Sequence, residues 1–174
     1  MINVYENVLE EHVALGIHEL IKNVSWKYDY PSNTSKPDRH WHVLCGEDGE
    51  LFFDFDWVDS IWKAANHKFN FLENYGVQKF KRAYMNAHDY GSEPQMHVDD
   101  GDFTMIYYPR TDWKLEWGGG TLIVENGVNH LADYKPNSLV VFDAKLKHAA
   151  QAVSRSCHEL RTVVVFKCNK GVVV

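Results

Sequence analysis

The sequence predicts a mainly β domain of the α+β class, in which a jelly roll is supported by two N-terminal helices. Apolar residues recur at three- and four-residue steps in the first part of the chain, which is typical of helices. After Gly76 the period shortens towards two, and the segments become short and rich in β-branched and aromatic residues. We therefore expect a single domain over residues 1–174, with helical support and a lid loop in residues 1–76 and the β core in residues 77–168.

Two helices are expected before the β core. The first covers residues 8–24, where one face carries Leu9, Val13, Ile17, Leu20, Ile21 and Val24. Residues 28–49 are rich in Pro, Ser, Asn, Asp and Gly, which predicts a loop or lid. The second helix covers residues 58–72, with Asp56 or Asp59 as its N-terminal cap and Gly76 at its end.

Short strands are expected in the remainder of the chain. They lie near residues 77–87, 95–99, 103–109, 120–125, 130–134, 138–143, 147–153 and 160–167. Turn signals separate them at Gly91, Gly101, the three glycines 118–120, Asn126-Gly127 and Pro136-Asn137. So many strands after a helical segment favour a sandwich or barrel.

Composition and charge argue against several classes of protein. The net charge of −6 shows no basic excess for duplex DNA or an anionic membrane, so nucleic acid is a disfavoured partner. Cys45, Cys157 and Cys168 form an odd set without CxxC spacing, which fits reduced thiols. The N-terminus carries acidic residues where a signal peptide has basic ones, and no apolar run has the length to cross a bilayer. We expect a soluble, cytoplasmic protein, with its oligomeric state left open.

Three residues predict a metal site. His97 and Asp99 are separated by one residue, so on a strand their side chains point to the same face. Among the ten histidines, only His97 has a carboxylate two residues later. His148 begins a late strand that a rolled sheet could bring back beside the pair. Two imidazoles and one carboxylate on one face of an ion suit Fe(II) in oxygenases better than zinc, which prefers a closed tetrahedron.

Arg161 and three tyrosines are the other candidate site residues. Arg161 precedes the apolar run 162–166, which predicts a buried guanidinium that needs an anionic partner. That partner is either a protein carboxylate or the distal carboxylate of a dicarboxylate ligand. Three tyrosines, Tyr84, Tyr107 and Tyr108, lie on strands that flank the metal residues. Each of them has either a packing role in the core or a contact with a ligand. Because neighbours on a strand face opposite sides, only one of Tyr107 and Tyr108 can point inwards.

Residues 82–166 resemble the 2-oxoglutarate and Fe(II)-dependent dioxygenases, and within them the prolyl hydroxylase branch. The resemblance covers about half of the chain and rests on the order and spacing of His97-Val98-Asp99, residues 104–109, Asp112-Trp113, residues 118–122, His148 and Arg161. It implies a cupin-like double-stranded β-helix in which His97, Asp99 and His148 bind iron and Arg161 pairs with the C5 carboxylate of 2-oxoglutarate. It also implies that the Tyr108 hydroxyl meets that carboxylate and that Tyr84 lines the cosubstrate pocket.

The resemblance further implies a hydroxylase that uses O2 and 2-oxoglutarate to oxidise a substrate C–H bond, releasing succinate and CO2; a role for ascorbate is left open. By resemblance alone, the expected substrate is a peptidyl residue, with proline first. The alternatives are the same chemistry on a nucleobase or a free small molecule, and a cupin-like metal-binding module without turnover.

The segment from Arg39 to His42 is placed either to cover the substrate or to form an ordinary surface loop. His40 and His42 also have the spacing of an adventitious metal site.

The chain departs from the resembling family at three places. The interval from His148 to Arg161 is longer and contains an enlarged loop over residues 154–158, in which Arg155 is a rival clamp. Pro109 and Arg110 stand where the family usually has Leu-Asn, which predicts an early end to that strand. Lys167 occupies a position that is often aromatic.

Overall fold

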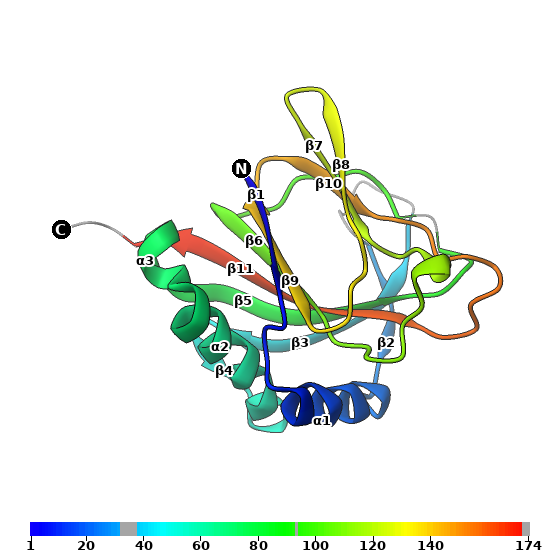
Figure 1. The fold of residues 1–174 in the computed structure, drawn as a ribbon, viewed down its shortest axis with the longest axis horizontal. Helices are drawn as coiled ribbons and strands as arrows, with labels where there is room; N and C mark the ends of the chain where they lie inside the picture. Colours follow the sequence, from blue (N-terminus) through cyan, green and yellow to red (C-terminus); the bar gives the residue numbers. More distant parts are fainter. Residues whose placement is uncertain (32–37, 93, 172–174) are drawn as a thin grey trace.

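The computed structural model describes residues 1–31, 38–92 and 94–171, and its strands form two antiparallel sheets (Figure 1). The larger sheet has the order β1 (Ile2–Glu6), β9 (Ser138–Asp143), β6 (Phe103–Tyr108), β11 (Arg161–Lys170), β5 (Val77–His88), β3 (His40–Glu47) and β2 (Lys27–Tyr30), with β4 (Glu50–Leu51) paired to β3. The smaller sheet has the order β10 (Lys147–Ala150), β7 (Thr121–Glu125) and β8 (Val128–Ala132). This arrangement confirms the expected mainly β, double-stranded β-helix fold.

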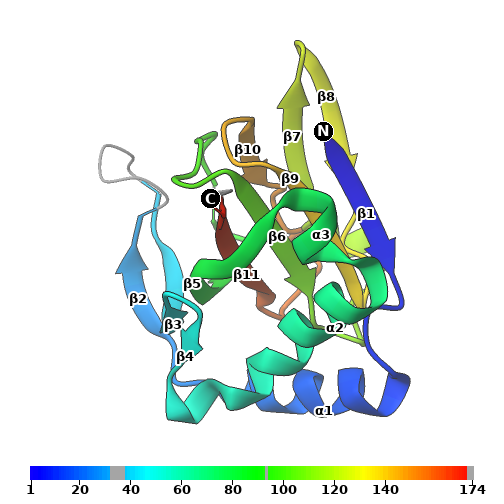
Figure 2. The ribbon, with the colours of Figure 1, turned by 90° about the vertical axis from the view of Figure 1, so that its left-hand side faces the viewer.

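The helices lie on the face of the larger sheet that points away from the smaller sheet (Figures 1 and 2). They are α1 (Glu11–Lys22), α2 (Asp59–Phe69) and the short α3 (Phe71–Tyr75), preceded by the 3-10 turn η1 (Phe53–Val58); a second such turn, η2 (Leu115–Trp117), lies between β6 and β7. The second expected helix is therefore divided at Asn70, which has a left-handed backbone with φ of 48°. None of the helices in the described ranges has the length and apolarity needed to cross a membrane.

The predicted cap of the second helix is wrong. Val58 stands at the N-terminal cap position of α2, and no side chain caps it. The stability of this helix comes instead from its buried face, because Ile61 and Ala65 are fully buried against the larger sheet. Gly76 follows the last helical residue with φ of +64°, as its predicted role at the end of the helical segment requires.

Two clusters of buried apolar residues hold the layers together. The first lies between the helices and the larger sheet and includes Ile17, Ile61, Tyr107 and Phe166. The second lies between the two sheets and includes Tyr108, Ile123 and Val163 among others. Tyr107 and Tyr108 therefore point into different clusters, as the alternation of side chains along a strand predicted. Of the two, Tyr108 faces the space between the sheets.

The loop predicted over residues 28–49 is wrong for most of its described part. β2 and β3 occupy residues 27–30 and 40–47, and β3 pairs with β5 from Trp41↔Ala87 to Glu47↔Arg82. These long-range backbone hydrogen bonds offset the weak β-pattern of the segment, in which polar His40 and His42 alternate with Trp41 and Val43. The part of the prediction that falls on residues 32–37 lies outside the described residues. The strand β1 was not predicted either.

The division into a helical part and a β part is also wrong in content, because β1, β2 and β3 from the first 76 residues belong to the larger sheet. The strand expected over residues 95–99 is reduced to an isolated bridge between His97 and His148. The other predicted strands lie within a few residues of the observed ones, and β6 ends at Tyr108, directly before Pro109. The sequence does not specify which strands pair. It therefore could not show that residues 95–99 have almost no neighbouring strand with which to form backbone hydrogen bonds.

Candidate functional site

His97, Asp99 and His148 come together between the two sheets. One potential ligand atom from each lies within 4.8 Å of the other two, and no other group of three such residues is found in the described part of the chain. The bridge between His97 and His148 brings this about, since each backbone N–H donates to the carbonyl of the other residue at 3.0 and 2.9 Å. The Asp99 backbone N–H donates to the Ala144 carbonyl at 2.8 Å. The three residues predicted from sequence are therefore brought into one cluster.

The backbone also orients both imidazole rings. Nδ1 of His97 lies 2.8 Å from the Gln95 carbonyl oxygen, and Nδ1 of His148 lies 2.9 Å from the Leu146 carbonyl oxygen. A carbonyl only accepts hydrogen bonds, so each Nδ1 carries a proton, and Nε2 is the nitrogen of each ring that faces Asp99 and can bind a metal. The two Nε2 atoms lie 3.6 and 3.4 Å from the Asp99 carboxylate. Burial and then the neighbouring His148 lower the pKa of His97, which favours the neutral imidazole that binds a metal.

Asp99 is held by two further side chains. Its side chain is 4% exposed; Thr104 donates to Oδ2 at 2.7 Å, and the Lys167 ammonium donates to Oδ1 at 2.8 Å. Burial alone raises the pKa of Asp99, but the hydrogen bond from His148 and the charge of Lys167 outweigh it and hold the pKa well below its usual range. The carboxylate is therefore ionised and fixed in orientation. Two imidazoles and one carboxylate form a donor set that fits Fe(II).

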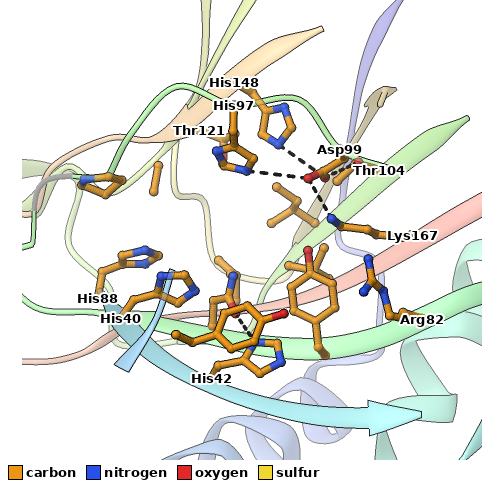
Figure 3. Close-up of a pocket in the computed structure, with 18 of the residues that line it drawn as sticks. His40, His42, Arg82, His88, His97, Asp99, Thr104, Thr121, His148 and Lys167 are labelled. Atoms are coloured by element: carbon orange, nitrogen blue, oxygen red, sulfur yellow. Dashed lines mark hydrogen bonds and ion pairs between the residues drawn. The ribbon is translucent and has the colours of Figure 1, made fainter. Parts of the chain in front are cut away.

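The cluster lies on the wall of a cavity of about 400 Å3 between the sheets. Arg161 and Lys167 line the same cavity from β11, and they lie six residue steps apart on the strand, which corresponds to roughly 20 Å. Figure 3 shows His97 and His148 above the cavity, with Asp99 and Lys167 on one side of it and His40 and His88 on the other. The space between these two sides has a size typical of small-ligand sites.

Arg161 is 2% exposed, and its partners in the described residues are neutral. Its Nε donates to the Gly119 carbonyl, and Nη2 donates to the Gly120 carbonyl at 3.2 Å and lies 3.4 Å from Oγ1 of Thr121. Nη1 lies 3.5 Å from Nδ1 of His88, and burial together with the charge of Arg161 keeps the pKa of His88 well below its ordinary value. No carboxylate within the described ranges lies at ion-pairing distance from this guanidinium.

Arg110 shows how the same chain compensates another buried guanidinium. It is 3% exposed, and its Nε and Nη2 donate to both carboxylate oxygens of Asp112 at 2.8 Å, while Nη2 also donates to Glu159 at 2.9 Å. An uncompensated buried charge is costly, so the different surroundings of Arg161 require an anion from elsewhere. Two partners were expected for Arg161, a protein carboxylate or the carboxylate of a ligand, and the described residues do not supply the first. The arrangement fits an anionic ligand in the cavity.

The predicted cosubstrate tyrosines have different positions. The Tyr108 hydroxyl lies 2.7 Å from Oγ1 of Thr121, which in turn lies beside Nη2 of Arg161. Tyr108 is not among the residues that line the cavity, and its link to Arg161 runs through Thr121. Tyr84 does line the cavity, but at the end near the metal residues, where the Lys167 ammonium lies 5.6 Å from the centre of its ring. Burial and the nearby Asp99 raise the pKa of Tyr84.

Sequence reasoning missed several residues of the site. Thr104 lies two residues before Ile106 on β6, so both side chains point to the same face and line the cavity. The alternation along the strand could therefore have indicated Thr104. His88 lies opposite Arg161 in the β5–β11 ladder, and only the register of that ladder reveals the contact. His40 and His42 line the cavity, but the described residues place them in no three-residue metal cluster. Arg155, the rival clamp, is exposed and does not line the cavity.

Comparison with known proteins gave matches at the level of structure. No protein-family model matches the sequence, and no curated protein matches it. A prolyl-4-hydroxylase of Pseudomonas putida superposes with a TM-score of 0.67 at 14% identity, over 98% of this chain and 92% of that one. An oxidoreductase of the 2OG-Fe(II) oxygenase family from Burkholderia pseudomallei gives 0.68 at 13% identity, over 98% and 85%. A prolyl hydroxylase of Trichoplax adhaerens, in complex with a peptide fragment of the hypoxia inducible factor oxygen degradation domain, gives 0.62 at 16%, over 97% and 83%. The chain therefore shares the fold of prolyl hydroxylases and related oxygenases.

Proposed function

We propose that the chain is a 2-oxoglutarate- and Fe(II)-dependent oxygenase that hydroxylates a C–H bond and releases succinate and CO2. In this proposal His97, Asp99 and His148 hold Fe(II), and Arg161 binds the C5 carboxylate of 2-oxoglutarate. The observation that carries it is the buried charge of Arg161, which has no carboxylate partner among the described residues and faces the cavity that also contains the three metal-competent side chains.

The residues of the chain have separate tasks in this reaction. Fe(II) with bound 2-oxoglutarate supplies the activation of O2 and the oxidation of the C–H bond. Thr104 and Lys167 fix the carboxylate of Asp99, and backbone carbonyls fix the two imidazoles, so the ligand set is formed before a metal arrives. Ile106, Val163 and Val165 line the cavity between its polar ends and keep water away from the reacting groups.

We propose a peptidyl substrate, with a prolyl residue first. Two of the similar structures are prolyl hydroxylases, and one of these holds a peptide fragment. In the present chain, Tyr30, His42 and Arg82 line the cavity from the β2–β3 and β5 side, so an incoming group meets aromatic and polar side chains there. A nucleobase or a free small molecule remains the alternative for the same chemistry. A metal-binding module without turnover gives no account of the charge of Arg161.

Anaerobic addition of Fe(II) and 2-oxoglutarate tests the chemistry directly. The weak visible charge-transfer band of the chelate should form with the unmodified protein and be absent in His97→Ala and Asp99→Ala. Arg161→Met should weaken 2-oxoglutarate binding by roughly 100-fold while it leaves metal binding intact, because a charge-assisted contact is lost. Arg110→Met is the matched control: it removes an equally buried guanidinium, lowers stability, and should leave 2-oxoglutarate affinity unchanged.

Three results would contradict the proposal. One is a protein that binds Mn(II) through the three residues but gives no band with Fe(II) and 2-oxoglutarate. Another is equal loss of metal and 2-oxoglutarate binding in Arg161→Met, which would mark Arg161 as a folding residue. The third is the absence of succinate when the protein is incubated with Fe(II), 2-oxoglutarate and O2. Screening peptide pools and then small-molecule pools for a mass gain of one oxygen separates the peptidyl substrate from its alternatives.

A further inference from the structure

His40 and His88 form a pair of buried imidazoles in the wall of the cavity. They lie side by side on β3 and β5, with ring centres 4.9 Å apart and planes inclined by 30°. His40 is 2% exposed and His88 is 6% exposed, yet both line the cavity (Figure 3). The β5–β11 register places His88 directly opposite Arg161. The end of the cavity away from Lys167 is therefore lined by Arg161 and two imidazoles.

The polar atoms of His40 lack partners in the described structure. Both Nδ1 and Nε2 are buried and make no hydrogen bond of good geometry, although the Asn86 side chain comes near enough to the ring to influence it. Its neighbour His42 differs, since Nδ1 of His42 lies 2.8 Å from the Asn86 side-chain oxygen. Buried polar groups almost always have a partner, and an imidazole can offer one N–H and one acceptor when it is neutral. Two unpartnered nitrogens in a cavity wall indicate a group that the cavity accommodates.

Burial, together with the charges around these rings, favours the neutral form. Burial is the main cause that lowers the pKa of His40 to about 4, and His42 and His97 act in the same direction. The charge of Asp38 and a weak hydrogen-bonding contact with Asn86 oppose this shift. Burial and then the charge of Arg161 lower the pKa of His88, and His40 and His97 contribute to the same shift. Each ring therefore carries one N–H at neutral pH. Neither adds a positive charge to the one that Arg161 already carries.

The contact with Arg161 decides which nitrogen of His88 is protonated. Nη1 of Arg161 can only donate, so Nδ1 of His88, 3.5 Å away, accepts, and the proton lies on Nε2. His88 thus takes up one N–H of the guanidinium and offers another N–H of its own. Since the Nε and Nη2 groups of Arg161 already donate to Gly119 and Gly120, the guanidinium alone has few donors left for a carboxylate with two oxygens.

We infer that His88 and His40 complete the anion subsite of Arg161, each donating an N–H to the distal carboxylate of the cosubstrate. This inference rests on the proposed function, because it takes 2-oxoglutarate as the ligand. It assigns to two histidines on β3 and β5 a role in choosing a dicarboxylate over a monocarboxylate 2-oxo acid. Such a role is one of binding and specificity, since the two rings need not approach the reacting carbon.

The test measures the affinity for 2-oxoglutarate and for pyruvate, which has the same chelating end but no distal carboxylate. Dissociation constants are measured by anaerobic isothermal titration of the Mn(II)-loaded protein, and the unfolding temperature of each variant verifies that it folds. His88→Leu and His40→Leu should each weaken 2-oxoglutarate binding about 10-fold and leave pyruvate binding nearly unchanged. His88→Gln and His40→Gln, which keep an N–H donor, should recover much of the loss. His130→Leu, at an exposed position on β8, is the control.

The outcomes separate this inference from the proposed function. If the unmodified protein binds 2-oxoglutarate but both leucine variants bind it equally well, the inference is wrong and the proposed function stands. If the leucine variants weaken 2-oxoglutarate and pyruvate to the same extent, the two histidines have a structural role only, and the inference is again wrong. If only His88→Leu lowers the preference for the dicarboxylate, the extension to His40 is wrong. If the unmodified protein does not bind 2-oxoglutarate, both proposals fail together.

Discussion

The ammonium group of Lys167 lies 2.8 Å from Oδ1 of Asp99, so the carboxylate of the candidate metal site is already paired with a cation of the chain. Both side chains are shielded from solvent, with 12% of Lys167 and 4% of Asp99 exposed. Lys167 replaces a residue that is often aromatic in the resembling family. A divalent cation that binds Asp99 therefore comes close to the positive charge of the Lys167 ammonium, which repels it.

Lys167→Met is expected to lower the stability of the metal-free protein by about 2 kcal/mol, since it leaves the charge of Asp99 with only the hydrogen-bonding support of Thr104 and His148. A bound dication can take over the role of the lost ammonium. The rise in unfolding temperature on adding Mn(II) should therefore be larger in Lys167→Met than in the unmodified protein. Thermal unfolding with and without the metal measures both effects.

Lys63→Met is the control for this prediction, because Lys63 pairs with Asp59 on the exposed surface of α2. It should change neither the stability nor the response to Mn(II) appreciably. An identical Mn(II)-induced rise in Lys167→Met and the unmodified protein would show that Lys167 does not compete with the metal for Asp99.

Thr104→Val is expected to reduce metal affinity about 10-fold with little change in packing. The substitution removes the 2.7 Å hydrogen bond to Oδ2 of Asp99 but keeps the volume of the side chain. Thr162→Val is a matched control on the neighbouring strand, since Thr162 is also buried but its Oγ1 has no partner in the described structure. Titration with Mn(II), monitored by calorimetry, should separate the two variants. Equal affinities would mean that Thr104 does not orient the carboxylate.

Gly119→Ala is expected to disturb Arg161. Gly119 has φ of +78°, and an added Cβ would lie 3.0 Å from the Trp113 ring and 3.2 Å from Cδ of Arg161. Gly127 has the same φ but open space around its Cβ position, so Gly127→Ala isolates the backbone strain, about 1 kcal/mol. Gly119→Ala should cost about 1–3 kcal/mol more in urea unfolding and should also weaken 2-oxoglutarate binding. A loss of affinity in both variants would point to a cause other than the displacement of Arg161.

The stability of the metal-free protein is expected to fall as the pH decreases from about 6.5 to about 4. Burial lowers the pKa of His40 from 6.5 to about 4, so the unfolded chain binds a proton in this interval and the folded chain does not. The stability that this group contributes is fully present above pH 6.5 and is lost as the pH approaches 4, by at most about 3 kcal/mol. His88 and His97 act in the same direction, because burial lowers the pKa of each.

Urea unfolding at a series of pH values measures this loss. His40→Asn should make the dependence on pH shallower, because an amide does not titrate. His12→Asn, at an exposed position on α1, should leave the dependence as it is. If His40→Asn loses stability between pH 6.5 and 4 as steeply as the unmodified protein, His40 is not the group that is protonated on unfolding.

The sequence alone determined the fold class, the two main helices and the metal-competent residues. These features depend on local patterns: the 3.6-residue period of α1 and α2, the alternation along β5 to β11, and the one-residue spacing between His97 and Asp99. It also predicted that Arg161 would be buried, because an apolar strand follows it. A local pattern could not show that β2 and β3 belong to the larger sheet, since β3 pairs with β5 between residues 35 to 46 positions apart and β2 joins the sheet only through β3.

Only the tertiary structure decided which side chains meet in the cavity. The bridge between His97 and His148 closes the metal cluster across the two sheets, and the β5–β11 register sets His88 against Arg161 at one end and Arg82 beside Lys167 at the other. The sequence left two partners open for the buried charge of Arg161. The fold gives carboxylates to Arg110 and, among the described residues, only neutral acceptors to Arg161. Charge compensation depends on which groups lie within a few ångströms, and that is set by long-range packing rather than by position along the chain.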